Sequence, residues 1–390
     1  MQPIRDGAHA SQPKRAGKVG AAEVLGVPLL PPGVVVAAGN RVRAGIARLH
    51  RATAPPPARI LEAALGMLDV SVLATLCRLD LPDRLDRPMD AGQLADDLGV
   101  DRDRFERLLR YAATRGWVRR NRRGQLCPTK VTAFLRRAHP GGWRAWVEFA
   151  ATDEVHAALQ ALDGGLASTG DAFADANGAP FFDWMRARPQ QHVLFDAAMA
   201  AGGQMHGLVL ARTLDWSKSR RVCDIGGGDG ALLAVLCAQH QHLDGIILEL
   251  AEVAARVRTQ PRVGAVAGDA FVAVPGGFDT YLLVNILHDW DDAAATQLLA
   301  RAAAALDDDA AMANSDAIVR RVVVVESQMN TRPHDDLAIR ADLLMLALTP
   351  GGRERTVAEI AVLGKAAGLR LVRSRRLASG DRAHVLMRQQ

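Results

Sequence analysis

A glycine-rich segment at residues 221–233, RVCDIGGGDGALL, is the stretch of this sequence best suited to bind a ligand. Its apolar residues predict a short buried strand, and the alternating Gly226, Gly228 and Gly230 predict a sharp turn into a helix. Because these positions lack a Cβ, a ligand can approach the main chain closely. Taken alone, the segment fits nucleotide-type binding and also an ordinary strand-to-helix turn.

The next apolar runs also end in side chains that can bind ligands or transfer protons. They are Glu249 in the run 245–250, Asp269 and Phe271 after the run 263–267, and His288 after the run 281–287. An acid about twenty residues beyond the glycine turn is where a doubly wound fold contacts a ribose. Ligands in open α/β sheets bind at the carboxyl ends of the strands, so we expect these side chains to lie near one site.

The motifs VCDIGGGDGALL, GDAF (268–271), NILHDWDD (285–292) and GGRERT (351–356) occur in this order, with Glu249 between the first two. Together they resemble the S-adenosylmethionine-dependent O-methyltransferases related to plant caffeic acid methyltransferase and bacterial polyketide O-methyltransferases. The ordered set is specific, although each motif alone is not. The resemblance implies an α/β fold with a Rossmann-like, mostly parallel sheet. It also implies an N-terminal all-helical, winged-helix-like dimerisation domain.

The resemblance implies that His288, the histidine of the HDW motif, is the catalytic base. A histidine of pKa near ~6.5 suits this task, because a phenol of pKa near ~10 is mostly protonated at neutral pH. The family places two carboxylates beside this histidine. Glu354 matches one of them, and Glu326 is the better match for the other, with Asp316 as a weaker alternative because the stretch before Glu326 is longer than usual. The structural alternative for Glu354 is a salt bridge with a neighbouring arginine of GGRERT.

The resemblance also implies a donor site at the glycine turn, where Glu249 accepts both ribose hydroxyls in place of the Asp of many relatives. The other donor contacts that it implies are Asp224, Gly226, Gly228, Gly230, Asp269, Ala270, Phe271 and Trp290. The acceptor-facing positions that it implies are Phe195, Met199, Met345 and Thr349. A core role is the alternative for Trp290.

The expected donor is S-adenosyl-L-methionine, with S-adenosyl-L-homocysteine as product, and the expected acceptor is a phenolic hydroxyl of an aromatic small molecule. No acidic or amide cluster resembles the magnesium site of metal-dependent catechol methyltransferases. The run Asp307-Asp308-Asp309 is typical of a solvated loop. We therefore expect a reaction without a metal ion.

A chain of 390 residues is long enough for two or three domains. Residues 1–54 are rich in Gly, Pro, Arg and Ala, which predicts a flexible tail. We expect the winged-helix-like domain at 55–140, a helical linker that contributes to the substrate pocket at 141–216, and the catalytic domain at 217–390, where strands and helices alternate. By similarity, the apolar helical segment 60–76 implies a homodimer.

Arginines at 115, 119, 120, 122 and 123 crowd the predicted wing, which raises a second hypothesis, a DNA-binding regulator. A family member with non-methylating chemistry is a third. The net charge of +5 is mild for this length and does not favour nucleic acid by itself. The four cysteines lack metal-ligand spacing and predict a reduced, cytoplasmic protein. No unbroken run of eighteen apolar residues occurs, so we expect no membrane span.

Overall fold

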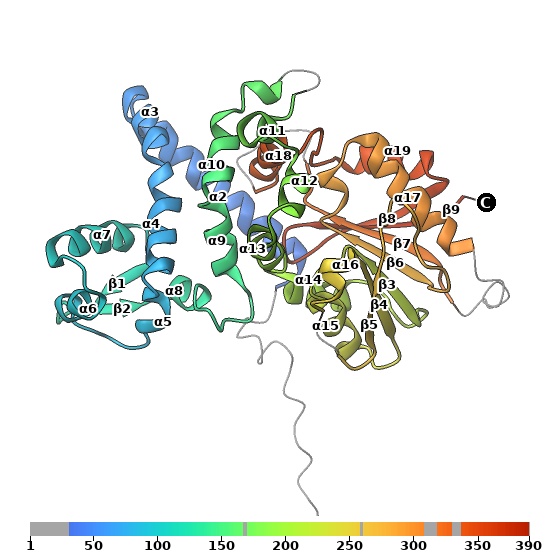
Figure 1. Cartoon of the computed structure of the whole chain (residues 1–390), viewed down its shortest axis with the longest axis horizontal. Coiled ribbons are helices and arrows are strands. Elements are labelled where there is room, and N and C mark those ends of the chain that lie inside the picture. Colours follow the sequence, from blue (N-terminus) through green and yellow to red (C-terminus); the bar gives the residue numbers. More distant parts are fainter. Residues whose placement is uncertain (1–30, 167–169, 258–259, 308–317, 330–336, 390) are drawn as a thin grey trace, which may run out of the picture.

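The computed structural model describes residues 31–166, 170–257, 260–307, 318–329 and 337–389. Figure 1 shows a helical part formed by the N-terminal half of the chain beside an α/β part formed by the C-terminal half. The first described helix is α2 (Gly33–Thr53), so the expectation of a flexible tail over residues 1–54 is wrong for residues 33–53. Composition misled this prediction, because the segment carries apolar side chains at helical spacing among its glycines and arginines.

The N-terminal region from α3 to α8 is helical except for a small antiparallel hairpin, formed by β1 and β2. Asp90 and Asp101 each accept a hydrogen bond from the main chain three residues on and so cap two of its helices. Its core is formed by Leu76, Leu94 and Phe105, among others. The elements are α3 (Pro56–Leu65), α4 (Met67–Arg78), α5 (Leu81–Arg84), α6 (Ala91–Leu98), α7 (Arg102–Thr114), β1 (Val118–Arg120), β2 (Leu126–Pro128) and α8 (Lys130–Phe134).

A second helical layer connects this N-terminal region to the sheet (Figure 1). Its core is aromatic: Phe149, Phe173 and Phe181 are buried together, and Phe195 packs against them. Helices α10 and α11 contact a helix of the C-terminal half, α18 (Leu337–Leu348). The layer consists of α9 (Trp143–Ala150), α10 (Asp153–Gln160), η1 (Gly164–Leu166), α11 (Ala172–Asn177), α12 (Phe181–Arg186), α13 (Pro189–Met199) and α14 (Gly203–Thr213).

The C-terminal half is built on a seven-stranded sheet of order β5-β4-β3-β6-β7-β9-β8. The first five strands in this order are parallel, and β9 pairs antiparallel with both β7 and β8. The mostly parallel sheet of the predicted fold class is thereby confirmed. The strands are β3 (Arg221–Ile225), β4 (Asp244–Glu249), β5 (Val263–Ala267), β6 (Thr280–Val284), β7 (Arg321–Glu326), β8 (Leu369–Arg376) and β9 (Arg382–Arg388).

Helices cover both faces of this sheet, which explains why its central strands are almost wholly apolar. On one face, Tyr281 and Val322 pack against α17 (Asp292–Asp307) and α19 (Val357–Ala366). On the other face, Val222 and Val323 pack against α14 and α15 (Ala231–Gln239). Thr356 and Glu359 form a capping box at the start of α19. The remaining short elements are α16 (Ala251–Ala254) and η2 (Leu287–Asp289).

The N-terminal helices leave apolar side chains exposed. Ile60, Leu61, Leu65 and Met67 on α3 and α4 are examples, and α2 carries others. By length and composition, the helical segments Pro56–Arg78 and Pro189–Thr213 could each cross a membrane. This evidence is weak, because helices packed in a soluble core pass the same test. The four cysteines are buried and form no disulfide bond.

Candidate active site

The segment that follows β6 brings the predicted base to the carboxyl edge of the sheet. Asn285 adopts a left-handed conformation with φ 55°, and its N–H donates to the carbonyl of Val325 on the neighbouring strand. This turn ends the strand and starts η2, the short helix that carries His288. A non-glycine residue in this conformation is uncommon, and such residues occur often at functional sites.

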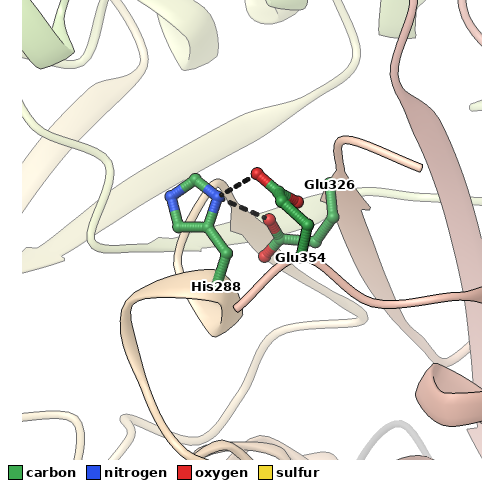
Figure 2. Close-up of side chains that lie close together, drawn as sticks. All are labelled: His288, Glu326 and Glu354. Atoms are coloured by element: carbon green, nitrogen blue, oxygen red, sulfur yellow. Dashed lines mark hydrogen bonds and ion pairs between the residues drawn. The ribbon is translucent and has the colours of Figure 1, made fainter. Parts of the chain in front are cut away.

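His288 meets the two glutamates that the sequence singled out. Its Nδ1 lies 3.1 Å from Oε1 of Glu354 and 3.3 Å from Oε2 of Glu326. Figure 2 shows both carboxylates on one side of the imidazole ring, while the other ring nitrogen points away from them. Both glutamates are buried and His288 is partly buried. Three segments distant in sequence therefore converge on one ring nitrogen.

Each glutamate is also fixed through the main chain. Oε1 of Glu326 accepts hydrogen bonds from the N–H groups of Ile286, at 3.2 Å, and Leu287, at 2.8 Å. The N–H of Glu354 donates to Asp342 on α18. Glu326 therefore contacts His288 and also holds the turn on which His288 lies.

The charges around His288 favour its protonated form. Burial alone would lower the pKa of His288, but the carboxylates of Glu326, Asp289 and Glu354 outweigh it and raise this pKa to about 10. Burial raises the pKa of Glu326 above its ordinary value and that of Asp289 to about 6. Nε2 of His288 lies 3.5 Å from the Asp289 carboxylate, a neighbour that the sequence analysis missed.

The alternative role for Glu354, a salt bridge with Arg353 or Arg355, is not observed. Arg353 pairs with Glu359, and Arg355 pairs with Asp292. The competitor Asp316 lies outside the described residues. The donor atoms of His288, Glu326 and Glu354 lie within 4.8 Å of one another, a spacing at which such groups could hold a metal ion.

The predicted donor residues line the turn after β3. Gly226, Gly228 and Gly230 all have positive φ angles, which favour glycine. A Cβ at Gly226 would lie 2.5 Å from the side chain of Ile286, in the segment leading to His288. Glu249, at the end of β4, accepts hydrogen bonds from the N–H groups of Gly228 and Leu250. The glycine turn, the acid and the base thus lie at the same sheet edge.

Asp224 is wholly buried at the end of β3, just before the glycine turn. Its Oδ2 has no hydrogen-bond partner among the described residues. Burial, with a smaller contribution from the charge of Glu249, raises the pKa of Asp224 to about 8. A buried carboxyl group without a partner fits a ligand that brings a hydrogen-bond donor or a positive charge. S-adenosylmethionine, which carries an ammonium and a sulfonium, has this chemistry.

Aromatic rings form the next part of the edge. Asp269 accepts a hydrogen bond from the N–H of Phe271, which orders the turn 269–271 containing Ala270. The Phe271 ring meets Trp290 edge-on, with centroids 4.7 Å apart. Trp290 is partly exposed, so it can present a face to a ligand. Phe182 stacks on Trp290, a contact that no local pattern in the sequence indicates.

The predicted acceptor residues divide between two helices. Phe195 on α13 packs edge-on against Phe149 and Phe181, while Met199, one turn later, is 43% exposed. Met345 and Thr349 are linked by a hydrogen bond from the Thr349 hydroxyl to the Met345 carbonyl at the end of α18. Thr349 is buried.

Comparisons with known proteins show the family to which the chain belongs. An O-methyltransferase domain model matches residues 159–370, and an O-methyltransferase dimerisation domain model matches residues 61–132. O-demethylpuromycin-O-methyltransferase of Streptomyces alboniger is 30% identical over 84% of this chain and 87% of its own length. 8-Amino-8-demethylriboflavin N,N-dimethyltransferase of Streptomyces davaonensis is 32% identical over 72% of this chain and 81% of its own.

Solved structures give the same result. The structure of LaPhzM matches with a TM-score of 0.76 and 26% identity, over 86% of this chain and all of that one. CalO1, a methyltransferase of calicheamicin biosynthesis in its SAH-bound form, matches with a TM-score of 0.73 and 28% identity over 85% of this chain and 98% of its own.

Proposed function

The chain belongs to the O-methyltransferase family of the bacterial natural-product type and is an S-adenosylmethionine-dependent O-methyltransferase, and we propose that it methylates a phenolic hydroxyl with His288 as general base. The observation that carries this proposal is the convergence of Glu326 and Glu354 on Nδ1 of His288. Nδ1–H donates to the carboxylates, which fixes the tautomer and leaves the lone pair of Nε2 to accept the proton of the acceptor.

The bound donor supplies an activated methyl group, so the protein has to align the acceptor with it and remove the acceptor's proton. When Nε2 takes that proton, His288 becomes an imidazolium between carboxylates that offset its charge. The same carboxylates raise the pKa of His288 to about 10, close to the ordinary value of a phenol. The transfer of the proton from phenol to imidazole is then nearly balanced in free energy, and the fraction of His288 that is unprotonated limits the rate below pH 10.

The donor site fits S-adenosylmethionine through complementary charge. Asp224 would face the positively charged part of the donor, and Glu249 would accept its ribose hydroxyls. Phe271 and Trp290 offer ring edges and faces to the adenine. Support comes from the partnerless Oδ2 of Asp224 and from the positive φ of the glycines.

The acceptor is an aromatic molecule in this proposal. Phe195 on the helical side offers a partly exposed ring, and Met199 and Met345 add flexible side chains that fit flat ligands of varied outline. Relatives are named for methylating such molecules, for example the 2,7-dihydroxy-5-methyl-1-naphthoate 7-O-methyltransferase of Streptomyces carzinostaticus.

We extend the proposal to the organisation of the chain. Residues 55–140 and the matched dimerisation model support a homodimer, with residues 141–216 bordering the acceptor and 217–390 binding the donor. The free cysteines support a reducing, cytoplasmic setting. Arg115 and Arg120 near the wing pair with Asp69 and Glu106, which leaves less positive charge for DNA than the sequence suggested.

The test is incubation of the purified protein with methyl-labelled S-adenosylmethionine and a library of aromatic phenols, with the matching anilines and methyl ethers alongside. Label in a phenol product, but not in the methyl ethers, supports the proposal. Transfer only to anilines would show that the acceptor is an amine instead of a phenol. Loss of activity with a chelator would show that the reaction needs a metal ion. Salt-dependent binding to duplex DNA without methyl transfer would favour the regulator instead.

A further inference from the structure

Arg355 is a buried cation beside the proposed catalytic site that the reaction described above does not use. It follows Glu354 directly in the GGRERT segment and is only 2% exposed. Its partner Asp292 lies at the start of α17 and has a side chain that is 58% exposed. Burying a guanidinium costs free energy unless its N–H groups are hydrogen-bonded. The groups that accept these hydrogen bonds therefore indicate the role of Arg355.

The guanidinium binds the turn that carries His288 on both sides of that residue. One terminal nitrogen donates to the carbonyl of Leu287 at 2.6 Å, and the other donates to the carbonyl of Trp290 at 2.7 Å. Nε donates to Asp292 at 2.9 Å. The rigid fork of arginine thus spans the turn from residue 287 to residue 290, with His288 between the two bound carbonyls.

The main chain of Arg355 joins this turn to the segment that carries Glu326. Residue 355 forms a parallel bridge with Gln328, and its carbonyl accepts the N–H of Met329 at 3.3 Å. Gln328 lies two residues after Glu326. The side chain of Arg355 is therefore bound to the turn of His288, and its main chain is paired with the segment after Glu326. Glu354 is its covalent neighbour.

A glycine in the same segment confirms how closely the two stretches pack. A Cβ at Gly352 would lie 2.6 Å from the carbonyl oxygen of His288 and 2.1 Å from Oγ1 of Thr349. The GGRERT segment therefore lies directly against the main chain of the base.

We propose that Arg355 is a positioning residue for the methyl transfer: it holds the 287–290 turn so that Nδ1 of His288 stays against Glu326 and Glu354. This inference rests on the proposed role of His288. Lysine cannot replace arginine here, because a single ammonium cannot reach two carbonyls and a carboxylate in the same fixed plane. The charged groups facing His288 are Glu326 from β7, Glu354 from the segment before α19 and Asp289 from its own turn.

The experiment compares Arg355→Lys with a matched control, Arg353→Lys, which changes the exposed arginine two residues earlier in the same segment. The first readout is the ¹⁵N titration of the His288 imidazole in the protein without acceptor, assigned with His288→Ala. In Arg355→Lys the pKa of His288 should fall by about one unit or more, because a displaced ring loses part of its contact with the two carboxylates. Arg353→Lys should titrate as the wild type.

The second readout is turnover. Arg355→Lys should lower the limiting kcat, reached at high pH where His288 is unprotonated, by about 10- to 100-fold, the cost of a misplaced catalytic group, with the affinity for S-adenosylmethionine unchanged. The kcat–pH profile should shift to lower pH together with the titration. Because the titration needs no acceptor, a wild type that transfers no methyl group would refute the proposed function and leave the test of Arg355 intact.

A folded Arg355→Lys whose His288 titrates like the wild type would overturn the proposal. The proposal would also be overturned if the fall in kcat came with a similar fold loss of donor affinity and a lower melting temperature. That pattern indicates a purely structural role. If Arg355→Lys does not fold, Asp292→Ala decides, because it removes one of the three hydrogen-bond acceptors of the guanidinium at an exposed position. A smaller His288 shift in the same direction supports the proposal, and a wild-type titration overturns it.

Discussion

Phe182 stacks on Trp290, with ring centroids 5.2 Å apart and ring planes only 15° from parallel. Phe182 belongs to α12 of the helical layer, whereas Trp290 lies two residues after His288 in the C-terminal half. Phe271 contacts the same indole edge-on. The stack therefore connects the helical layer proposed to border the acceptor to the residues proposed to bind adenine.

Removing the Phe182 ring should weaken donor binding indirectly, because Phe182 supports Trp290 and is not itself proposed to contact S-adenosylmethionine. Aromatic pairs contribute about 0.5–1.5 kcal/mol, so Phe182→Ala should raise the Kd for S-adenosylmethionine by about 2- to 12-fold by releasing the indole. Calorimetry measures this Kd, and Phe182→Tyr, which keeps the ring, is the control. An unchanged Kd for Phe182→Ala would show that Trp290 does not need this support.

Substituting His288 should separate chemistry from binding. His288→Ala should cut turnover by about 10²–10⁴-fold, the usual effect of losing a general base, and leave the Kd for S-adenosylmethionine nearly unchanged. His288→Gln should do little better, because an amide cannot take a proton. High pH should partly restore His288→Ala by ionising the phenol in solution. Full activity in His288→Ala would refute the base.

The wild-type pH profile should rise on the alkaline side of neutrality. The neutral imidazole is the active base, and the carboxylates raise the pKa of His288 to about 10, so the fraction of active enzyme falls as the pH drops below that value. We expect kcat to increase between pH 7 and 10, measured with an acceptor whose own ionisation is known. Glu354→Gln should move this rise to lower pH, since it removes one of the charges that raise the pKa. A profile that is flat above pH 7 in the wild type would contradict this reading.

Glu249 should contribute to donor affinity. Glu249→Ala should weaken S-adenosylmethionine binding by about 1–3 kcal/mol, because the ribose would lose a charged hydrogen-bond acceptor. Glu252→Ala, an exposed glutamate on α16, is the matched control and should bind as the wild type. Equal affinities in calorimetry would remove Glu249 from the donor site.

The exposed apolar face of α3 should be covered by a second copy of the chain. Light scattering should give about twice the chain mass of 41.7 kDa, and the double variant Leu61→Asp/Leu65→Asp should give a monomer. Val362→Asp changes a similarly exposed apolar residue on α19 and should stay dimeric. A monomeric wild type at micromolar concentration would contradict the homodimer.

The strand and helix pattern of the C-terminal half was predictable because each buried strand is a short apolar run that ends in a recognisable turn. The approach of His288 to Glu354 followed only from the family resemblance, because the two residues are 66 positions apart and no local pattern relates them. Helix α2 was missed because its glycines and arginines mask its apolar spacing. The role of Arg355 was not predictable, since its partners are main-chain carbonyls, which carry no sequence signal.

Because Arg355 binds main-chain carbonyls, positions 287 and 290 can vary more freely than Arg355 itself. Every amino acid offers a carbonyl, so Arg355 holds the turn whatever side chains occupy positions 287 and 290. A library that randomises the acceptor-facing helices can therefore alter which molecule is bound without loosening the base. At Gly352 any added carbon meets the oxygen of His288, so tolerance to substitution should drop sharply there and at Arg355.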